Sequence, residues 1–181
     1  MFLNEAFLLF KKSKMKWTNF MNNKNNYTKS QLFWLVVLRV LIGWYFLYEG
    51  LAKVLTPDWT SYGYLMDSNG IFEFYFKMLT ESHVVISIVD AINVYGLILI
   101  GLSLILGCLS RIGYIGAVSL LILYCLSHPA LLDASYIFRP EGSYLWVDKN
   151  LIILSSVVVL MVFPTSKIIG LDRYIFRKVK E

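Results

Sequence analysis

Residues 84–106 read VVISIVDAINVYGLILIGLSLIL, an apolar stretch of 23 residues in which Asp90 is the single charged side chain. The hydrocarbon core of a bilayer requires about 20 mostly apolar residues in one helix, whereas an apolar run of about 10–14 residues is more typical of a buried core helix. The length and composition of this stretch therefore predict a helix that crosses a membrane.

Three further stretches have the same character: residues 33–55, 112–132 and 145–163. Seven of the 11 glycines lie inside these four stretches or at their ends, and small residues let membrane helices approach closely. We therefore predict an all-α fold, a polytopic membrane protein with a four-transmembrane-helix bundle and short interfacial helices in its outer loops. The aromatic-rich residues 71–79 are expected to form one of these interfacial helices.

The composition agrees with this class. Hydrophobic residues make up 57% of the chain and charged residues 16%, against about 45–50% and about 25% in soluble domains. So few charges do not cover a water-facing surface. The net charge of +5 is not a nucleic-acid signal, because the chain has no basic stripe interleaved with aromatic residues in a soluble unit.

Lys and Arg are unevenly distributed around the four stretches. Twelve of the 17 fall in residues 1–32, at Arg111 and after residue 163. Cytoplasmic segments of membrane proteins carry this excess of basic residues. We predict a multi-pass protein of the cytoplasmic (inner) membrane with both termini cytoplasmic. Residues 1–32 and 166–181 would be basic cytoplasmic tails on a membrane domain at residues 33–165.

The two cysteines exclude one class of redox enzyme. Cys108 and Cys125 lie at opposite ends of the predicted second and third helices, separated by 17 residues. A helix of that length spans about 25 Å, far beyond the reach of a disulfide. Because the chain also lacks a C-x-x-C motif, a dithiol enzyme of the vitamin K epoxide reductase or disulfide-generating kind is not expected.

The first predicted helix carries three ionisable residues on one face. At 100° per residue, Arg39, Glu49 and Lys53 share a side with Gly43 and Gly50. A charge at mid-bilayer costs about 2.5–3.5 kcal/mol on insertion scales, so such residues usually face the protein interior and carry function. The alternative is structural: Glu49 and Lys53, four residues apart, form an ion pair, and Arg39 reaches the cytoplasmic headgroups.

Two other polar positions are candidates at the outer ends of the helices. Asp90 is expected to face Lys53 or Lys149, or else to be a boundary carboxylate in contact with water. His128 precedes Pro129 where the third helix ends, and a site that includes it would hold both proton donors and acceptors. The alternative for His128 is a hydrogen-bonded helix terminus.

These arguments give a candidate site at the outer end of the first helix. The candidate catalytic residues are Glu49, Lys53 and His128, and the candidate ligand-binding residues are Arg39, Phe46, Gly50, Asp90, Trp146, Asp148 and Lys149. The second histidine, His83, lies at the far end of another loop, so neither a metal site nor a bis-histidine haem is expected. No flavin or nucleotide motif occurs in a suitable context.

Three runs of sequence resemble the DoxX/DoxD family of membrane proteins. Residues 38–53, LRVLIGWYFLYEGLAK, resemble the opening helix of that family, and residues 101–111, GLSLILGCLSR, resemble its second helix and tight inner turn. Residues 141–151, EGSYLWVDKNL, are similar to the DoxD branch in particular. The chain departs from the family pattern at Leu97 and Ile98, where an acidic residue is common, and its nearest acid is Asp90.

The resemblance implies a four-helix bundle linked to quinone chemistry, because the DoxD branch is named for the small subunit of a thiosulfate:quinone oxidoreductase. The expected function is a membrane subunit that passes electrons from a periplasmic-side donor or partner enzyme to membrane quinone. The quinone head would lie near Glu49, Lys53 and Lys149.

Other functions and assemblies stay open. The first alternative is a non-catalytic scaffold that recruits a partner enzyme through its outer loops. A small-solute carrier is a third hypothesis, but the lack of an internal repeat makes this function less favourable for a monomer. Homo-oligomerisation is also open.

Overall fold

The computed structural model describes residues 27–69, 72–129 and 147–175. The chain divides into two units, residues 1–33 and 34–181. Of the first unit the structure describes residues 27–33, which contain the start of helix α2. Every candidate site residue with a described position belongs to the second unit.

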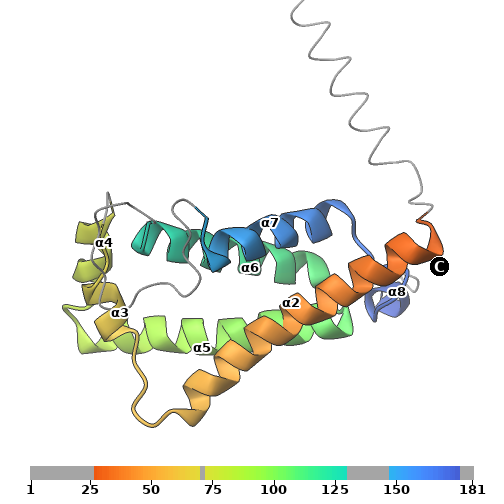
Figure 1. The fold of residues 1–181 in the computed structure, drawn as a ribbon. Coiled ribbons are helices and arrows are strands. Elements are labelled where there is room, and N and C mark those ends of the chain that lie inside the picture. The colour runs from red at the N-terminus through yellow and green to blue at the C-terminus, as the bar shows by residue number, and fades with distance from the viewer. Residues whose placement is uncertain (1–26, 70–71, 130–146, 176–181) are drawn as a thin grey trace, which may run out of the picture. The chain divides into compact units, whose positions relative to one another are not determined.

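The described residues form helices joined by turns, and they contain no strand. The helices are α2 (Lys29–Leu55), α3 (Tyr62–Met66), α4 (Glu73–Met78), α5 (His83–Leu106), α6 (Ser110–Ser127), α7 (Lys149–Val162) and α8 (Asp172–Ile175) (Figure 1). Three of them, α2, α5 and α6, are long and apolar enough to cross a membrane. α7 is a shorter apolar helix of 14 residues. The prediction of an all-helical chain is therefore confirmed for the described residues, and three of the four predicted spans are helices of spanning length and composition.

Three predicted helix boundaries are wrong. The first helix begins at Lys29, four residues before the predicted start at residue 33. The third helix does not continue to residue 132 but ends at Ser127 with His128 as its C-cap, because the residue before a proline is disfavoured in the α conformation. The fourth does not include Val147 or Asp148 and begins at Lys149. Asp148 is extended, with φ −115° and ψ 170°, and its side chain caps the helix by accepting from the Leu151 N–H at 2.7 Å.

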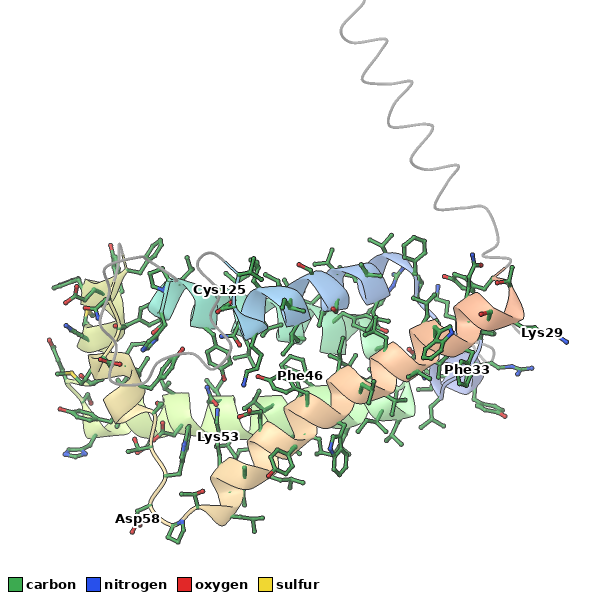
Figure 2. The ribbon with its side chains drawn as sticks, in the orientation of Figure 1. Lys29, Phe33, Phe46, Lys53, Asp58 and Cys125 are labelled. Atoms are coloured by element: carbon green, nitrogen blue, oxygen red, sulfur yellow. The ribbon has the colours of Figure 1, made fainter. Side chains whose placement is uncertain are left out.

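Helix α2 has one exposed apolar face and one face that is buried against other helices. Leu41, Trp44 and Tyr48 on one side are 57–63% exposed, as expected of side chains that contact lipid. On the other side, Phe46 is fully buried in a cluster that it forms with residues of α5, α6 and α7 (Figure 2). Its buried neighbours in the cluster include Leu97, Leu104, Leu121, Val157 and Leu160. This cluster is the hydrophobic core, and the helices that form it also carry the polar residues of the candidate site.

Glycines bring the backbones of α2 and α5 into contact. A Cβ atom on Gly101 of α5 would lie 2.5 Å from the Leu47 nitrogen and 2.7 Å from the Gly43 oxygen. Farther along the crossing, a Cβ atom on Gly50 would lie 3.0 Å from the Ile98 nitrogen. The two helices therefore pack as closely as small-residue membrane interfaces do. This contact positions the last turn of α2 over the polar residues of α5.

Candidate functional site

A chain of hydrogen bonds joins three helices where α2 ends. Lys53, in the last turn of α2, donates from Nζ to the Asn93 Oδ1 of α5 at 2.6 Å (Figure 2). Asn93 in turn donates from Nδ2 to the Tyr124 hydroxyl of α6 at 2.9 Å. The Lys53 ammonium also lies 4.8 Å from the ring centroid of Trp59 and 5.8 Å from that of Tyr124. These four residues form what we name the lysine cluster.

A second lysine lies beside the same helix. Lys149, the first residue of α7, has its Nζ 3.9 Å from the Glu49 Oε1 and 5.4 Å from the Tyr45 ring centroid. The structure therefore pairs Glu49 with Lys149, not with Lys53 as the four-residue spacing suggested. Both side chains of this pair are more than one third exposed, so the pair contributes less than about 1 kcal/mol to stability.

Asp90 anchors a loop and makes no ion pair with either lysine. Its Oδ1 accepts from the Ser61 N–H at 2.8 Å and also from the Ser61 hydroxyl. Ser61 is the N-cap residue of α3, so the carboxylate fastens the start of this short helix to α5. Asp90 lies about one helical turn before Asn93. Its bonds to Ser61 therefore hold the loop that carries Trp59 close to the other residues of the lysine cluster.

His128 belongs to a buried cluster that meets the lysine cluster, because Tyr64, on which it stacks, lies 6.1 Å from Tyr124 between ring centroids. Its ring is stacked on Tyr64 at 4.0 Å between centroids, and its Nδ1 lies 3.0 Å from the Ser127 hydroxyl. Its Nε2 lies 3.6 Å from the Asp67 Oδ2. Burial lowers the pKa of His128, although Asp67 acts in the opposite direction, and burial raises the pKa of Tyr64 above its usual range. The imidazole is 3% exposed, which matches the hydrogen-bonded helix terminus considered as its alternative role.

The remaining predicted residues do not contribute polar groups to the lysine cluster. Arg39 lies ten residues before Glu49, about 15 Å away along α2. It is buried and donates to the Thr165 hydroxyl at 3.1 Å and to the Ile169 carbonyl at 2.8 Å, so it does not reach out to headgroups. Phe46 and Gly50 are packing residues, Asp148 is a helix cap, and Trp146 lies outside the described residues.

Three residues of the site were not among the candidates taken from the sequence: Asn93, Tyr124 and Trp59. Asn93 carries a usable signal, because a polar side chain in an apolar span is expected to face the protein interior. Tyr124 and Trp59 carry none, since aromatic residues occur throughout the chain and are typical of membrane interfaces. Only the folded arrangement brings their rings to the Lys53 ammonium.

Comparisons with protein-family models, with curated proteins and with solved structures find no match for this chain.

The chemistry of the site therefore has to be derived from its residues. Among the described residues, no group of three or more His, Cys, Asp or Glu side chains is placed to hold a metal ion. The lysine cluster instead combines an ammonium group with aromatic faces and a neutral amide. Lysine has three N–H donors, and Lys53 gives one of them to Asn93. Such a set of groups can donate hydrogen bonds to an acceptor oxygen.

Proposed function

We propose that this chain is a DoxX/DoxD-type protein of the cytoplasmic membrane and a subunit of a quinone-linked oxidoreductase. Its fourth span would be α7, whose 14 residues cover about 21 Å of the roughly 30 Å hydrocarbon core. Both termini would be cytoplasmic, as the excess of Lys and Arg at that end indicates. The lysine cluster would then lie near the periplasmic side.

The observation that supports the quinone site is the Lys53–Asn93–Tyr124 chain, set among apolar helices. The remaining Lys53 donors would bind a quinone carbonyl, and the Trp59 and Tyr124 rings would flank the head group. Asn93 holds the ammonium in place by accepting its hydrogen bond, and Tyr124 fixes the Asn93 amide. When bound, quinone would supply the two-electron chemistry.

Glu49 is the residue that would handle protons. Its carboxylate is partly exposed, lies 3.9 Å from the Lys149 ammonium and comes one helical turn before Lys53. A carboxylate within reach of a reacting group acts as a general base or, once protonated, as a general acid. Since the sequence has no motif for haem, flavin or an iron–sulfur centre, a periplasmic-side partner would deliver the electrons, or the reduced substrate would react with quinone directly.

One observation favours a scaffold as the second candidate. Phe74 and Tyr75 on α4 are 73% and 65% exposed, next to the exposed Phe72 and Met78. A short helix with this many exposed aromatic and apolar side chains suits either a membrane interface or a partner protein. Under this reading the lysine cluster is a structural network that fixes the helix ends, and the chain carries no redox chemistry itself.

Purification from native membranes separates the two candidates. We expect quinone to co-purify with the wild-type protein at a fixed ratio, and this ratio to fall in Lys53→Met but not in the control Lys77→Met on α4. A stoichiometric partner protein with no quinone above the lipid background in the wild type would instead support the scaffold. Quinone retained equally by all three proteins would remove Lys53 from the site.

A further inference from the structure

The segment that follows α7, residues 165–175, buries its polar side chains and exposes its apolar ones, the reverse of a turn in a soluble protein. Its polar side chains point inward: Thr165 is fully buried, and Ser166 and Asp172 are 4% and 3% exposed. Its apolar side chains point outward. The exposed members are Ile168, Ile169, Leu171, Tyr174 and Ile175, at 36–68%. Such an arrangement is unfavourable in water, because it exposes apolar area that burial would remove from solvent.

The reversed polarity is held by specific bonds to α2 and to the turn between α5 and α6. Arg39 donates to Thr165 and to the Ile169 carbonyl. The Leu171 and Asp172 N–H groups donate to the Leu106 and Gly107 carbonyls at 3.1 and 2.8 Å.

Two glycines complete this attachment. A Cβ atom on Gly107 would lie 2.9 Å from the Gly170 Cα, so the two backbones are in contact. The hydrogen bonds and this backbone contact together keep the apolar side chains of residues 165–175 facing outward.

The charges on this face have one sign. Lys167 and Arg173 are exposed on the segment, and Arg111 is exposed at the start of α6, next to the Ser110 that Asp172 binds. The one acid of residues 163–175 is Asp172, which is buried and hydrogen-bonded. The sequence continues with Arg177, Lys178 and Lys180. Exposed apolar side chains interspersed with cations match the surface of an anionic monolayer.

We infer that residues 165–175 form a membrane-surface element that binds anionic phospholipid headgroups. The apolar side chains Ile168, Leu171 and Tyr174 would enter the headgroup–acyl boundary. Lys167, Arg173 and Arg111 would bind the lipid phosphates. A lipid surface fits better than a protein partner because the segment leaves one apolar helix and is fastened to the junction of two membrane-spanning helices, where the bilayer surface must lie. The inference depends on the membrane-spanning helices and not on the quinone site.

The test uses the full-length protein in nanodiscs of mixed phosphatidylglycerol and phosphatidylcholine. Native mass spectrometry after release measures which lipids stay bound. We expect phosphatidylglycerol to be enriched over its share in the disc, and the enrichment to fall about fivefold for each charge removed in Lys167→Gln and Arg173→Gln. Both side chains are exposed, so the variants should fold, and an unchanged melting temperature verifies this.

The control is Lys77→Gln, which removes one positive charge from α4, outside the segment. Enrichment that survives in this control but is lost in the Lys167→Gln/Arg173→Gln double variant supports the inference. Enrichment unchanged in the double variant, or absent in the wild type, overturns it. A protein bound to this face that protects Tyr174 from surface labelling, in place of lipid, overturns it as well. None of these outcomes depends on whether the protein binds quinone.

Discussion

The Asp172 carboxylate accepts hydrogen bonds from both the hydroxyl and the backbone N–H of Ser110, at 2.8 and 3.2 Å, across 62 residues of sequence. It also accepts from the Leu109 N–H at 2.7 Å. Leu109 is the N-cap residue of α6, has a left-handed backbone with φ 51°, and offers no side-chain cap of its own. Asp172 therefore caps α6 from the far end of the chain, and a negative charge at a helix N-terminus is favourable.

The first prediction concerns this cap. Asp172→Asn should lower the free energy of unfolding by about 1–3 kcal/mol at neutral pH, the usual cost of losing hydrogen bonds to a buried charged group. Burial alone would raise the pKa of Asp172, but its hydrogen bonds with Ser110, Ser166 and Leu109 outweigh burial and lower it. The carboxylate thus stabilises the fold fully above its unfolded pKa of 3.8, and this contribution is lost as the pH falls through the lower folded value.

Chemical unfolding in detergent, measured at several pH values, tests this cap. The difference between wild type and Asp172→Asn should shrink as the pH falls below the ordinary aspartate range. The neighbouring exposed Arg173→Gln should change the unfolding free energy little at any pH. If the free energy of unfolding of Asp172→Asn stays below that of the wild type by the same amount down to the most acidic pH, the cap depends on the shape of the side chain and not on its charge.

The Asp172 cap and the hydrogen bonds of Arg39 could not be predicted from the sequence. Apolar length and helical periodicity predicted the long apolar helices and the buried face of α2, because those features depend on local composition. The partners of Arg39 and Asp172 lie more than 60 residues away, and no local pattern encodes them. The sequence therefore placed Arg39 on the inward face of its helix, where it is buried, but did not identify its partners.

The second prediction compares two glycines of α5. Gly101→Ala should lower the free energy of unfolding by about 1–3 kcal/mol, because its Cβ would lie 2.5 Å from the Leu47 nitrogen and the backbones must separate. Gly96→Ala places its Cβ 3.8 Å from Leu120 Cδ1, an ordinary contact, and alanine favours the helix. We expect Gly96→Ala to be neutral or slightly stabilising. Thermal unfolding in one detergent measures both, and equal effects would argue against close packing of α2 on α5.

The third prediction concerns Asn93. Asn93→Leu removes the acceptor of Lys53 and the donor to Tyr124, leaving an ammonium group and a phenol with one partner fewer. We expect a loss of about 1–3 kcal/mol in stability and loss of quinone binding. The control Ser155→Ala removes a hydroxyl that bonds only to a carbonyl of its own helix, and it should leave both properties unchanged. Full quinone binding by a folded Asn93→Leu protein would exclude the amide from the site.

The sequence indicated which charged residues of the helices are unusual, but not the contacts that they make. Glu49, Lys53 and Lys149 were identified because charges in apolar helices are rare, and the structure places them at one end of α2. Their pairing was not predictable: a four-residue spacing permits an ion pair, but the approach of α5 and α7 offers each lysine another partner. His128 illustrates the reverse case, since a histidine at a helix end gives no sequence signal that separates a catalyst from a buried cap.

The fourth prediction concerns orientation. In a Cys108→Ser/Cys125→Ser background, whose two thiols are free in the structure, single cysteines are introduced at the exposed positions Glu81 and Lys167. A membrane-impermeant maleimide added to intact cells should label position 81 and should label position 167 only after lysis. The twelve basic residues at the Lys167 end determine this expectation. Labelling of position 167 in intact cells would invert the topology and place the lysine cluster on the cytoplasmic side.

The last prediction concerns Glu49. Glu49→Gln should abolish or strongly lower quinone reduction, measured in membranes and divided by the amount of inserted protein, because glutamine keeps the shape of the side chain but has no titratable proton. Its effect on stability should be below about 1 kcal/mol, since the Glu49–Lys149 pair is partly exposed and its atoms are 3.9 Å apart. Lost turnover at normal stability is the result that a proton-handling role requires.

The double variant Glu49→Gln/Lys149→Met separates this role from a structural one. If the pair only joins α2 to α7, removing both charges restores whatever stability and turnover the single variant loses, because an apolar replacement of an ion pair is often neutral. If Glu49 handles the proton, turnover stays lost in the double variant, because the carboxyl group is still absent. Normal turnover in the single Gln variant would remove Glu49 from the mechanism and leave the lysine cluster as a binding site only.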